Sequence, residues 1–122
     1  MYNSRQIGSD YENRAAQYLM DKGYNIVCRN FRVSQGEIDI IARKDGYYIF
    51  IEVKYRSNTK KGMAEEAVDI KKQRRISKVA LVYLKLNGLG TNVPVRFDVV
   101  TVTKDGIHHI ENAFDYIGGS VW

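Results

Sequence analysis

The sequence predicts an α/β fold in which helices flank one mixed β-sheet. Two segments carry apolar residues at helical spacing, and the residues on both sides of Asp45-Gly46 alternate between apolar and polar. In chain order we expect a helix, three strands, a second helix and two strands, an order typical of layered α/β domains. A chain of 122 residues has the size of one domain, which we assign to residues 1–122.

The first helix is predicted from Ile7 to Met20, where apolar residues recur every three or four positions and Gly23 follows as a natural stop. Glu12 lies on this helix, and two roles are open to it. It could complete a capping box with Ser9 as the N-cap, or it could approach the sheet as a functional carboxylate. The spacing alone does not decide between these roles.

A first strand is predicted from Tyr24 to Phe31, and a short link from Arg32 to Gly36 leads into a hairpin. Cys28 in this strand is interpreted as a small core residue and not as a nucleophile. Because it is the only cysteine, no intramolecular disulfide can form. We therefore expect a reducing compartment, the cytoplasm.

The Asp45-Gly46 turn sets the register of the following hairpin. If Lys44 pairs with Tyr47, Asp39 lies opposite Glu52, and each face of the hairpin has a distinct character. One face would be apolar, with Ile38, Ile40, Ala42, Ile49, Ile51 and Val53. The other face would gather Glu37, Asp39, Glu52 and Lys54. Facing carboxylates repel one another, so we expect the acidic pair to require a cation.

A plain surface hairpin, with Glu37 paired to Lys54, would leave the facing Asp39 and Glu52 unexplained. Beyond the hairpin, residues 57–62 form a polar, basic loop that contains Lys60 and Lys61.

A second helix is predicted from Ala64 to Leu86. Its inward stripe is apolar, with Ile76, Val79, Ala80 and Tyr83. Its first half is crowded with positive charge, from Lys71, Lys72, Arg74, Arg75 and Lys78. Lys72 lies one turn before Ile76 on the inward side, so it either faces an acidic group or snorkels along the surface.

A second hairpin is predicted from a strand at 95–102, a turn at Lys104-Asp105-Gly106 and a strand at 107–110. Arg96 lies two residues from Asp98 on the same face, which favours an ion pair over catalysis. His108 and His109 cannot share a face and lack metal-ligand spacing, so we interpret both as non-catalytic. The tail at 112–122 is expected to form a short helix and an apolar end.

The chain carries 19 Lys and Arg against 14 Asp and Glu, a net charge of +5. Because several acids belong to the hairpin cluster, the remaining surface is more basic than this sum, which favours a polyanionic partner. The N-terminus has no apolar signal-peptide core, and the longest apolar run, Val79 to Leu84, is too short to span a membrane. No membrane partner is therefore expected.

The hairpin's acidic face suggests a reaction. Asp39 and Glu52 offer the hard oxygen ligands that Mg²⁺ or Mn²⁺ prefers. Lys54 reaches the same space, where a cation can orient the attacking water or neutralise charge that develops at phosphorus. The basic loop and helix would bring a polyanion to the metal. The combination predicts a metal-dependent phosphodiesterase.

Asp39 followed by Glu52-Val53-Lys54 resembles the PD-(D/E)XK signature of the restriction-endonuclease-like superfamily, although Ile38 stands where the signature has proline. Further blocks are similar to the bacterial YraN-type family of uncharacterised endonuclease-like proteins: G-x-x-x-E at 8–12, RNFR at 29–32, GEIDIIA at 36–42, KQRRI at 72–76 and RFDVV at 96–100. The resemblance covers nearly the whole chain. It implies a restriction-endonuclease-like three-layer core with a mixed β-sheet flanked by helices.

The resemblance also implies residue roles. Asp39 and Glu52 would be metal ligands with the Val53 carbonyl as a third, and Lys54 would be the catalytic lysine. Glu12 would match the first-helix acid of archaeal Holliday-junction resolvases and complete the catalytic set.

Lys72 would match the second-helix Gln or Lys found near such sites. The residues expected to bind nucleic acid are Arg56, Lys60, Lys61, Lys71, Lys72, Arg74, Arg75 and Lys78.

Two functions from different classes compete. One is a Mg²⁺- or Mn²⁺-dependent endonuclease acting on DNA, including branched or damaged DNA, as a homodimer that places two sites on two strands. The other is a non-catalytic nucleic-acid-binding or complex-assembly module. A site that has lost catalysis has no evident reason to keep opposed carboxylates, which favours the enzyme.

Overall fold

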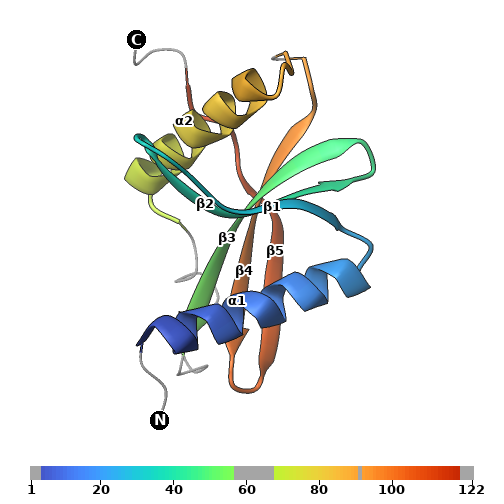
Figure 1. Cartoon of the computed structure of the whole chain (residues 1–122), viewed down its shortest axis with the longest axis vertical. Helices are drawn as coiled ribbons and strands as arrows, with labels where there is room; N and C mark the ends of the chain where they lie inside the picture. The colour runs from blue at the N-terminus through green and yellow to red at the C-terminus, as the bar shows by residue number, and fades with distance from the viewer. Residues whose placement is uncertain (1–3, 57–67, 91, 119–122) are drawn as a thin grey trace.

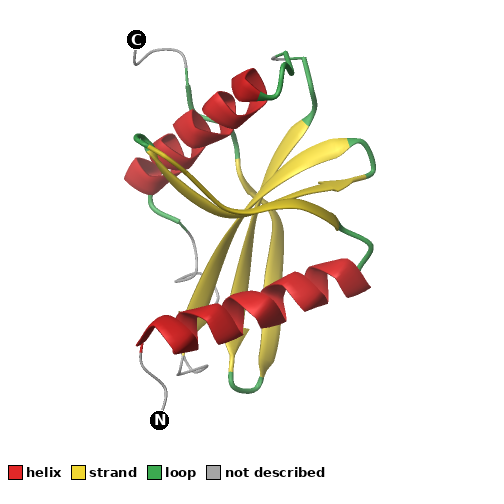
Figure 2. Cartoon of the chain, viewed as in Figure 1, coloured by secondary structure: helices red, strands yellow, loops and turns green. Residues whose placement is uncertain are grey.

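The computed structural model describes residues 4–56, 68–90 and 92–118, with side chains from Asp10 onward. Within these residues one sheet is flanked by two helices (Figures 1 and 2). In chain order the elements are α1 (Ser4–Asp21), β1 (Asn25–Val33), β2 (Gly36–Lys44), β3 (Tyr47–Arg56), α2 (Ile70–Leu86), β4 (Val95–Thr103) and β5 (Gly106–Phe114). This order confirms the prediction. Neither helix is long and apolar enough to cross a membrane.

The sheet is mixed and has the strand order β1-β2-β3-β4-β5. Only β3 and β4 pair in parallel, and α2 forms the connection between them, as parallel neighbours require. The pairs β1 with β2, β2 with β3 and β4 with β5 are antiparallel. The short turns that join these strands follow from that arrangement.

Each face of the sheet has its own hydrophobic cluster. On one face, Leu19 of α1 packs with Ile40, Ile51 and Val100. On the other, Val79 of α2 packs with a second set that includes Phe50 and Phe97. The sheet therefore lies between two helices as the middle of three layers, which fits the expected restriction-endonuclease-like core.

The turn between β2 and β3 has the geometry that the sequence predicts. Asp45 and Gly46 both have positive φ values, 54° and 85°, as a two-residue hairpin turn needs. The ladder runs in the predicted register from Lys44 opposite Tyr47 to Ile40 opposite Ile51. It ends there, so Asp39 and Glu52 are not a ladder pair.

Beyond Ile40, β2 continues to pair with β1, through Phe31 opposite Ile38 and Val33 opposite Gly36. Because β2 separates from β3 at this point, the alternation of faces is not maintained. Ile38 packs in the α2-side cluster, whereas Ile40 packs in the α1-side cluster. The prediction of one apolar face that includes Ile38 was therefore wrong.

Several predicted element ends also need correction. Helix α1 begins at Ser4, so Ser9 lies inside it and cannot be its N-cap, which removes the capping-box role of Glu12. Strand β1 extends to Val33 and meets β2 at Gly36, so the link predicted from Arg32 is part of a tight hairpin. Strand β5 continues to Phe114, and residues 115–118 are not helical, so the tail helix is absent from the described part.

Helix α2 begins at Ile70, and residues 68 and 69 are not helical. Asp69 is the N-cap, and its carboxylate accepts a hydrogen bond of 2.8 Å from the main-chain N–H of Lys72. This local cap sets the helix start later than the predicted Ala64. The loop at 57–62, with Lys60 and Lys61, and residues 64–67 lie outside the described residues.

The predicted ion pair of Asp98 and Arg96 is present and belongs to a larger buried network. Arg96 Nε lies 2.9 Å from one oxygen of Asp98, and His109 Nε2 lies 2.7 Å from the other. The hydroxyl of Tyr24 donates a third hydrogen bond of 3.1 Å. This network connects β4 and β5 to the segment that follows α1.

Candidate active site

Asp39 lies at the point where β2 separates from β3. Its Oδ2 accepts a hydrogen bond of 2.8 Å from the main-chain N–H of Val53, a group that the ladder no longer pairs. The carboxylate thus accepts the hydrogen bond that a main-chain carbonyl of β2 would accept in a continuous ladder. As a result, Asp39 lies beside β3, the strand that carries Glu52.

Burial and, after it, the charge of Glu52 raise the pKa of Asp39 to about 7, although the hydrogen bond from Val53 opposes this shift. The shift shows that the Asp39 carboxyl is buried and that the charge of Glu52 acts on it. The structure therefore brings together the two acids that the hairpin register had placed opposite each other.

Val53 supplies a further oxygen at the same place. In a strand, the N–H and C=O of one residue point to the same side. Because the N–H of Val53 points toward Asp39, its carbonyl oxygen also points toward the edge that β2 has left. The orientation suits its expected role as a third ligand.

Glu12 approaches this region from α1. Burial is the largest cause that raises its pKa, and the charges of Glu37 and Glu52 raise it further. Arg29 opposes the shift, with its guanidinium 4.0 Å from a carboxylate oxygen of Glu12. Glu12 therefore lies with Asp39 and Glu52, and we call these three residues the acidic cluster. This position is the one that a functional role of Glu12 requires.

Lys72 faces Glu52, which confirms that this inward lysine of α2 meets an acid. Its ammonium lies 2.5 Å from Oε2 of Glu52, whose side chain is only 10% exposed. The next helical turn continues the inward stripe with Ile76. Lys72 therefore provides a positive charge to the acidic cluster from α2, the helix on the other side of the sheet from α1.

Lys54 lies two residues after Glu52, in register with Thr101 of β4. Alternation along β3 places the Glu52 and Lys54 side chains on the same face. Arg56 ends the same strand and is exposed. Glu52, Lys54 and Arg56 thus follow one another along one face of β3.

The sequence pattern did not indicate two tyrosines that border the site. Tyr11 of α1 stacks on Tyr55 of β3, with ring centroids 5.5 Å apart. Burial and then the charge of Asp39 raise the pKa of the Tyr11 hydroxyl, which places it beside the carboxylates. Tyr11 precedes Glu12 and Tyr55 follows Lys54 in the sequence. This adjacency to predicted site residues was the sequence feature that could have indicated them.

Four further basic residues, all in the first half of α2, lie on a different side of the helix from Lys72. Together with Gln35 from the β1–β2 turn, they line one pocket: Lys71, Arg74, Arg75 and Lys78. Of the predicted nucleic-acid-binding residues, the structure thus places Lys72 beside the carboxylates and these four around a separate pocket. Arg56 ends β3, and Lys60 and Lys61 lie outside the described residues.

The donor set can be compared with the needs of a divalent ion. Within the described ranges, no three His, Cys, Asp or Glu side chains form a group that could hold a metal. The ligands at the β2–β3 separation are instead two carboxylates, from Asp39 and Glu52, and the Val53 carbonyl. All are hard oxygen donors, and Mg²⁺ commonly uses one or two carboxylates and fills its other positions with water. The residues therefore fit Mg²⁺ or Mn²⁺.

A three-layer α/β sandwich with two carboxylates and a lysine where two strands separate fits the restriction-endonuclease-like class of folds. The model of the uncharacterised protein family UPF0102 matches residues 11–102, and the chain belongs to this family. The matched range contains Glu12, Asp39, Glu52 and Lys54.

Individual relatives support this assignment. A UPF0102 protein of Lachnoclostridium phytofermentans is 51% identical over 116 residues, which cover 95% of this chain and 98% of the relative. A Clostridioides difficile UPF0102 protein is 45% identical over 92% of this chain and 99% of its own length. One from Thermodesulfovibrio yellowstonii is 44% identical over 89% and 96%, respectively. The family resemblance found in the sequence blocks is thereby confirmed.

Proposed function

We propose that this protein is a metal-dependent endonuclease that hydrolyses phosphodiester bonds of DNA, including branched or damaged DNA in repair or recombination. The observation that carries this proposal is the carboxylate of Asp39, held on the Val53 N–H beside Glu52 with its pKa raised to about 7. Perturbed carboxylates with a neighbouring lysine are typical of catalytic sites.

In this proposal, Asp39, Glu52 and the Val53 carbonyl hold Mg²⁺ or Mn²⁺. The metal supplies a Lewis acid for the phosphoryl oxygen and lowers the pKa of the attacking water. The Lys54 ammonium neutralises negative charge that develops on the phosphoryl group. Lys72 stays beside Glu52 and limits the charge repulsion within the cluster.

The proposal can be tested by incubating the purified protein with linear, nicked, flapped and four-way DNA in Mg²⁺ or Mn²⁺. We expect metal-dependent cleavage of at least one substrate, and we expect Glu52→Ala to abolish it. Asp45→Asn is the matched control, since it neutralises a carboxylate at the far end of the same hairpin while Asn still accepts positive φ. Undiminished cleavage by Glu52→Ala would place the activity elsewhere.

The competing function is a nucleic-acid-binding or assembly module without catalysis. It predicts that the parent protein binds DNA but cleaves none of these substrates with either metal. The same set of assays therefore separates the two functions.

A further inference from the structure

A basic pocket of about 320 Å³ lies between the β1–β2 turn and the first half of α2. Figure 1 shows this turn beside the beginning of the helix. The residues that line the basic pocket are Gln35, Lys71, Arg74, Arg75 and Lys78. It is distinct from the carboxylate site, to which α2 contributes Lys72.

Among the described residues, the positive charge of the basic pocket is not paired with acidic side chains. In the described part of the chain, none of its four cationic side chains forms an ion pair. The first turn of α2 also contains no acidic residue. Several like charges around one concavity attract a polyanion and raise its local concentration.

Close packing on Gly36 positions one of these cations. A Cβ atom at Gly36 would lie 3.0 Å from Cγ and 3.1 Å from Cδ of Arg75, so the arginine stem lies directly against the glycine backbone. The φ of Gly36, +149°, is also a conformation that other residues rarely adopt. The β1–β2 turn therefore holds Arg75 at a fixed place relative to β2.

That place is tied to the carboxylate site. Gly36 is the first residue of β2, and Asp39 lies three residues further along the same strand. At about 3.3 Å per strand residue, the two positions are about 10 Å apart. Successive phosphates of one DNA strand are at least ~3.4 Å apart, the rise along the helix axis, so about 10 Å spans no more than a few nucleotides.

We propose that the basic pocket binds a backbone phosphate of the DNA strand that is cut at the carboxylate site, within a few nucleotides of the scissile bond. This inference rests on the proposed function. Arginine and lysine are suited to the task, because guanidinium and ammonium groups form strong charge-assisted hydrogen bonds with phosphate. An acidic protein could match the charge, but it would give no reason for the pocket to lie beside the start of the strand that carries Asp39.

The first test measures binding without cleavage. Anisotropy of a fluorescein-labelled DNA duplex is titrated in EDTA at several salt concentrations, with the parent, Lys71→Gln and Arg75→Gln. Each lost phosphate contact should reduce the slope of log K against log salt by about 0.9. Lys85→Gln is the matched control, because it removes the same charge from an exposed position in the last turn of α2.

Binding of the same proteins to immobilised polyglutamate is measured in parallel, as a probe for an acidic protein partner. Two results would overturn the inference. One is a salt slope equal to the parent's for both pocket variants. The other is that the pocket variants lose polyglutamate binding but keep DNA binding, which would assign the pocket to an acidic protein. Lys71 is exposed, so its substitution is informative even if Arg75→Gln disturbs the packing on Gly36.

The second test locates the contacted phosphate. Duplexes with one neutral methylphosphonate linkage are bound to the parent and to Arg75→Gln. One linkage, within a few nucleotides of the cut, should weaken binding by the parent and have no further effect on the variant. Equal losses in both proteins at every linkage would contradict the contact. If the parent binds with the expected slope but never cleaves, the proposed function fails while the phosphate pocket stands.

Discussion

Individual charges in the acidic cluster each have one nearby partner. Asp39 accepts from Val53 N–H, Glu52 contacts Lys72, and Glu12 lies 4.0 Å from Arg29. Even so, burial and Glu52 keep the pKa of Asp39 near 7. Burial and the repulsion from Glu52 thus outweigh the hydrogen bond from Val53 at the Asp39 carboxylate.

Asp39→Asn should separate a metal site from an ordinary acidic surface. In EDTA we expect unchanged or slightly higher stability, because the amide oxygen can still accept from Val53 while the repulsion from Glu52 is relieved. Mg²⁺ at tenfold Kd should stabilise the parent by about 1.4 kcal/mol and the variant by much less. Thermal melts with EDTA or Mg²⁺ measure both effects, with Asp45→Asn as control. An equal Mg²⁺ effect in parent and Asp39→Asn would contradict the metal assignment.

Lys54→Met should affect turnover without removing the metal ligands. We expect cleavage to fall about 10²–10³-fold, the usual loss when one group that stabilises developing charge is removed. Mg²⁺ should still raise the melting temperature of the variant, since Asp39, Glu52 and Val53 remain. Single-turnover cleavage rates and melts test the two expectations, and Lys85→Met serves as a control at an exposed lysine. A variant that loses the Mg²⁺ effect would instead indicate a structural role for Lys54.

The β2–β3 hairpin shows how far the sequence predicts an element. The Asp45-Gly46 turn and the alternation set the register correctly as far as Ile40 opposite Ile51. The separation beyond that pair could not be predicted, because it depends on the Asp39 side chain taking up the main-chain N–H of Val53. The sequence therefore predicted correctly that Asp39 and Glu52 are neighbours. It predicted a ladder pair, whereas in the structure Asp39 reaches β3 through its side chain.

Helix α2 gives a second case. Apolar spacing predicted its buried stripe and its end at Leu86, where Asn87 follows as the C-cap. Its start was missed because the cap depends on one side chain, Asp69, which precedes Ile70 by a single position. Periodicity reports which face of a helix is buried, whereas capping decides where the helix begins.

Asp69→Ala should therefore destabilise the protein by about 1 kcal/mol, the usual loss when an N-cap acceptor is removed. Asp69→Asn should cost much less, since its amide oxygen can still accept from the N–H of Lys72. Chemical denaturation of the three proteins gives the comparison. Equal losses for Ala and Asn would point to the charge of Asp69, and not to its hydrogen bond, as the stabilising feature.

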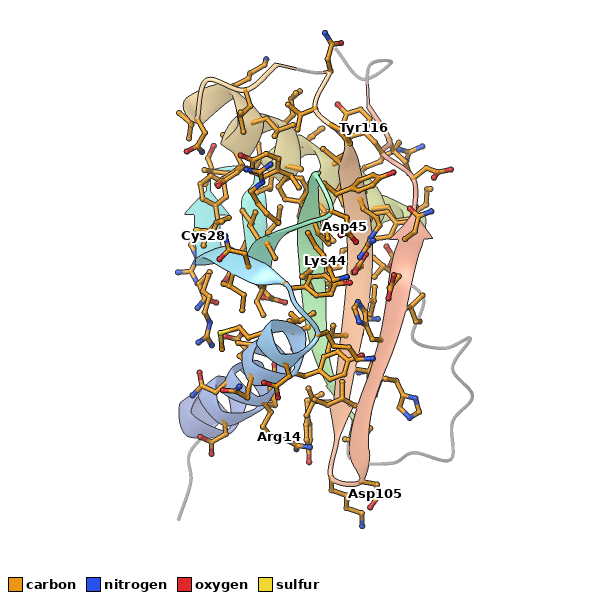
Figure 3. All side chains as sticks on the ribbon, turned by 90° about the vertical axis from the view of Figure 1, so that its right-hand side faces the viewer. Arg14, Cys28, Lys44, Asp45, Asp105 and Tyr116 are labelled. Carbon is orange, nitrogen blue, oxygen red and sulfur yellow. The ribbon has the colours of Figure 1, made fainter. Side chains whose placement is uncertain are left out.

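The assembled molecule depends on contacts between segments far apart in sequence. The pair of Arg96 and Asp98 was predictable because two residues in one strand share a face. Tyr24 and His109 could not be predicted as partners, since only the fold brings them to Asp98. Figure 3 shows Tyr116 at one end of the molecule and Asp105, in the β4–β5 turn, at the other end.

Asp98 makes the stability of the folded protein depend on pH in the acidic range. Burial would raise its pKa, but hydrogen bonds from His109, Arg96 and the Asn112 N–H lower it to about 2, below its ordinary value of 3.8. Its contribution to stability is thus fully present above about pH 4 and is lost as the pH falls toward 2. Asp39 acts in the opposite direction, because its folded-state pKa of about 7 lies above 3.8.

Between about pH 4 and 7 the folded protein binds more protons at Asp39 than the unfolded chain does, so stability falls as the pH rises. From these two groups we expect metal-free stability to rise from pH 2 to 4 and then to decline toward neutrality. Asp39→Asn should remove the decline and keep the rise, whereas Asp98→Asn should be destabilised above pH 4 and lose the rise. Urea unfolding in EDTA from pH 2 to 8 tests this. A parental decline that persists in Asp39→Asn would show that the buried carboxylate at the strand separation is not its source.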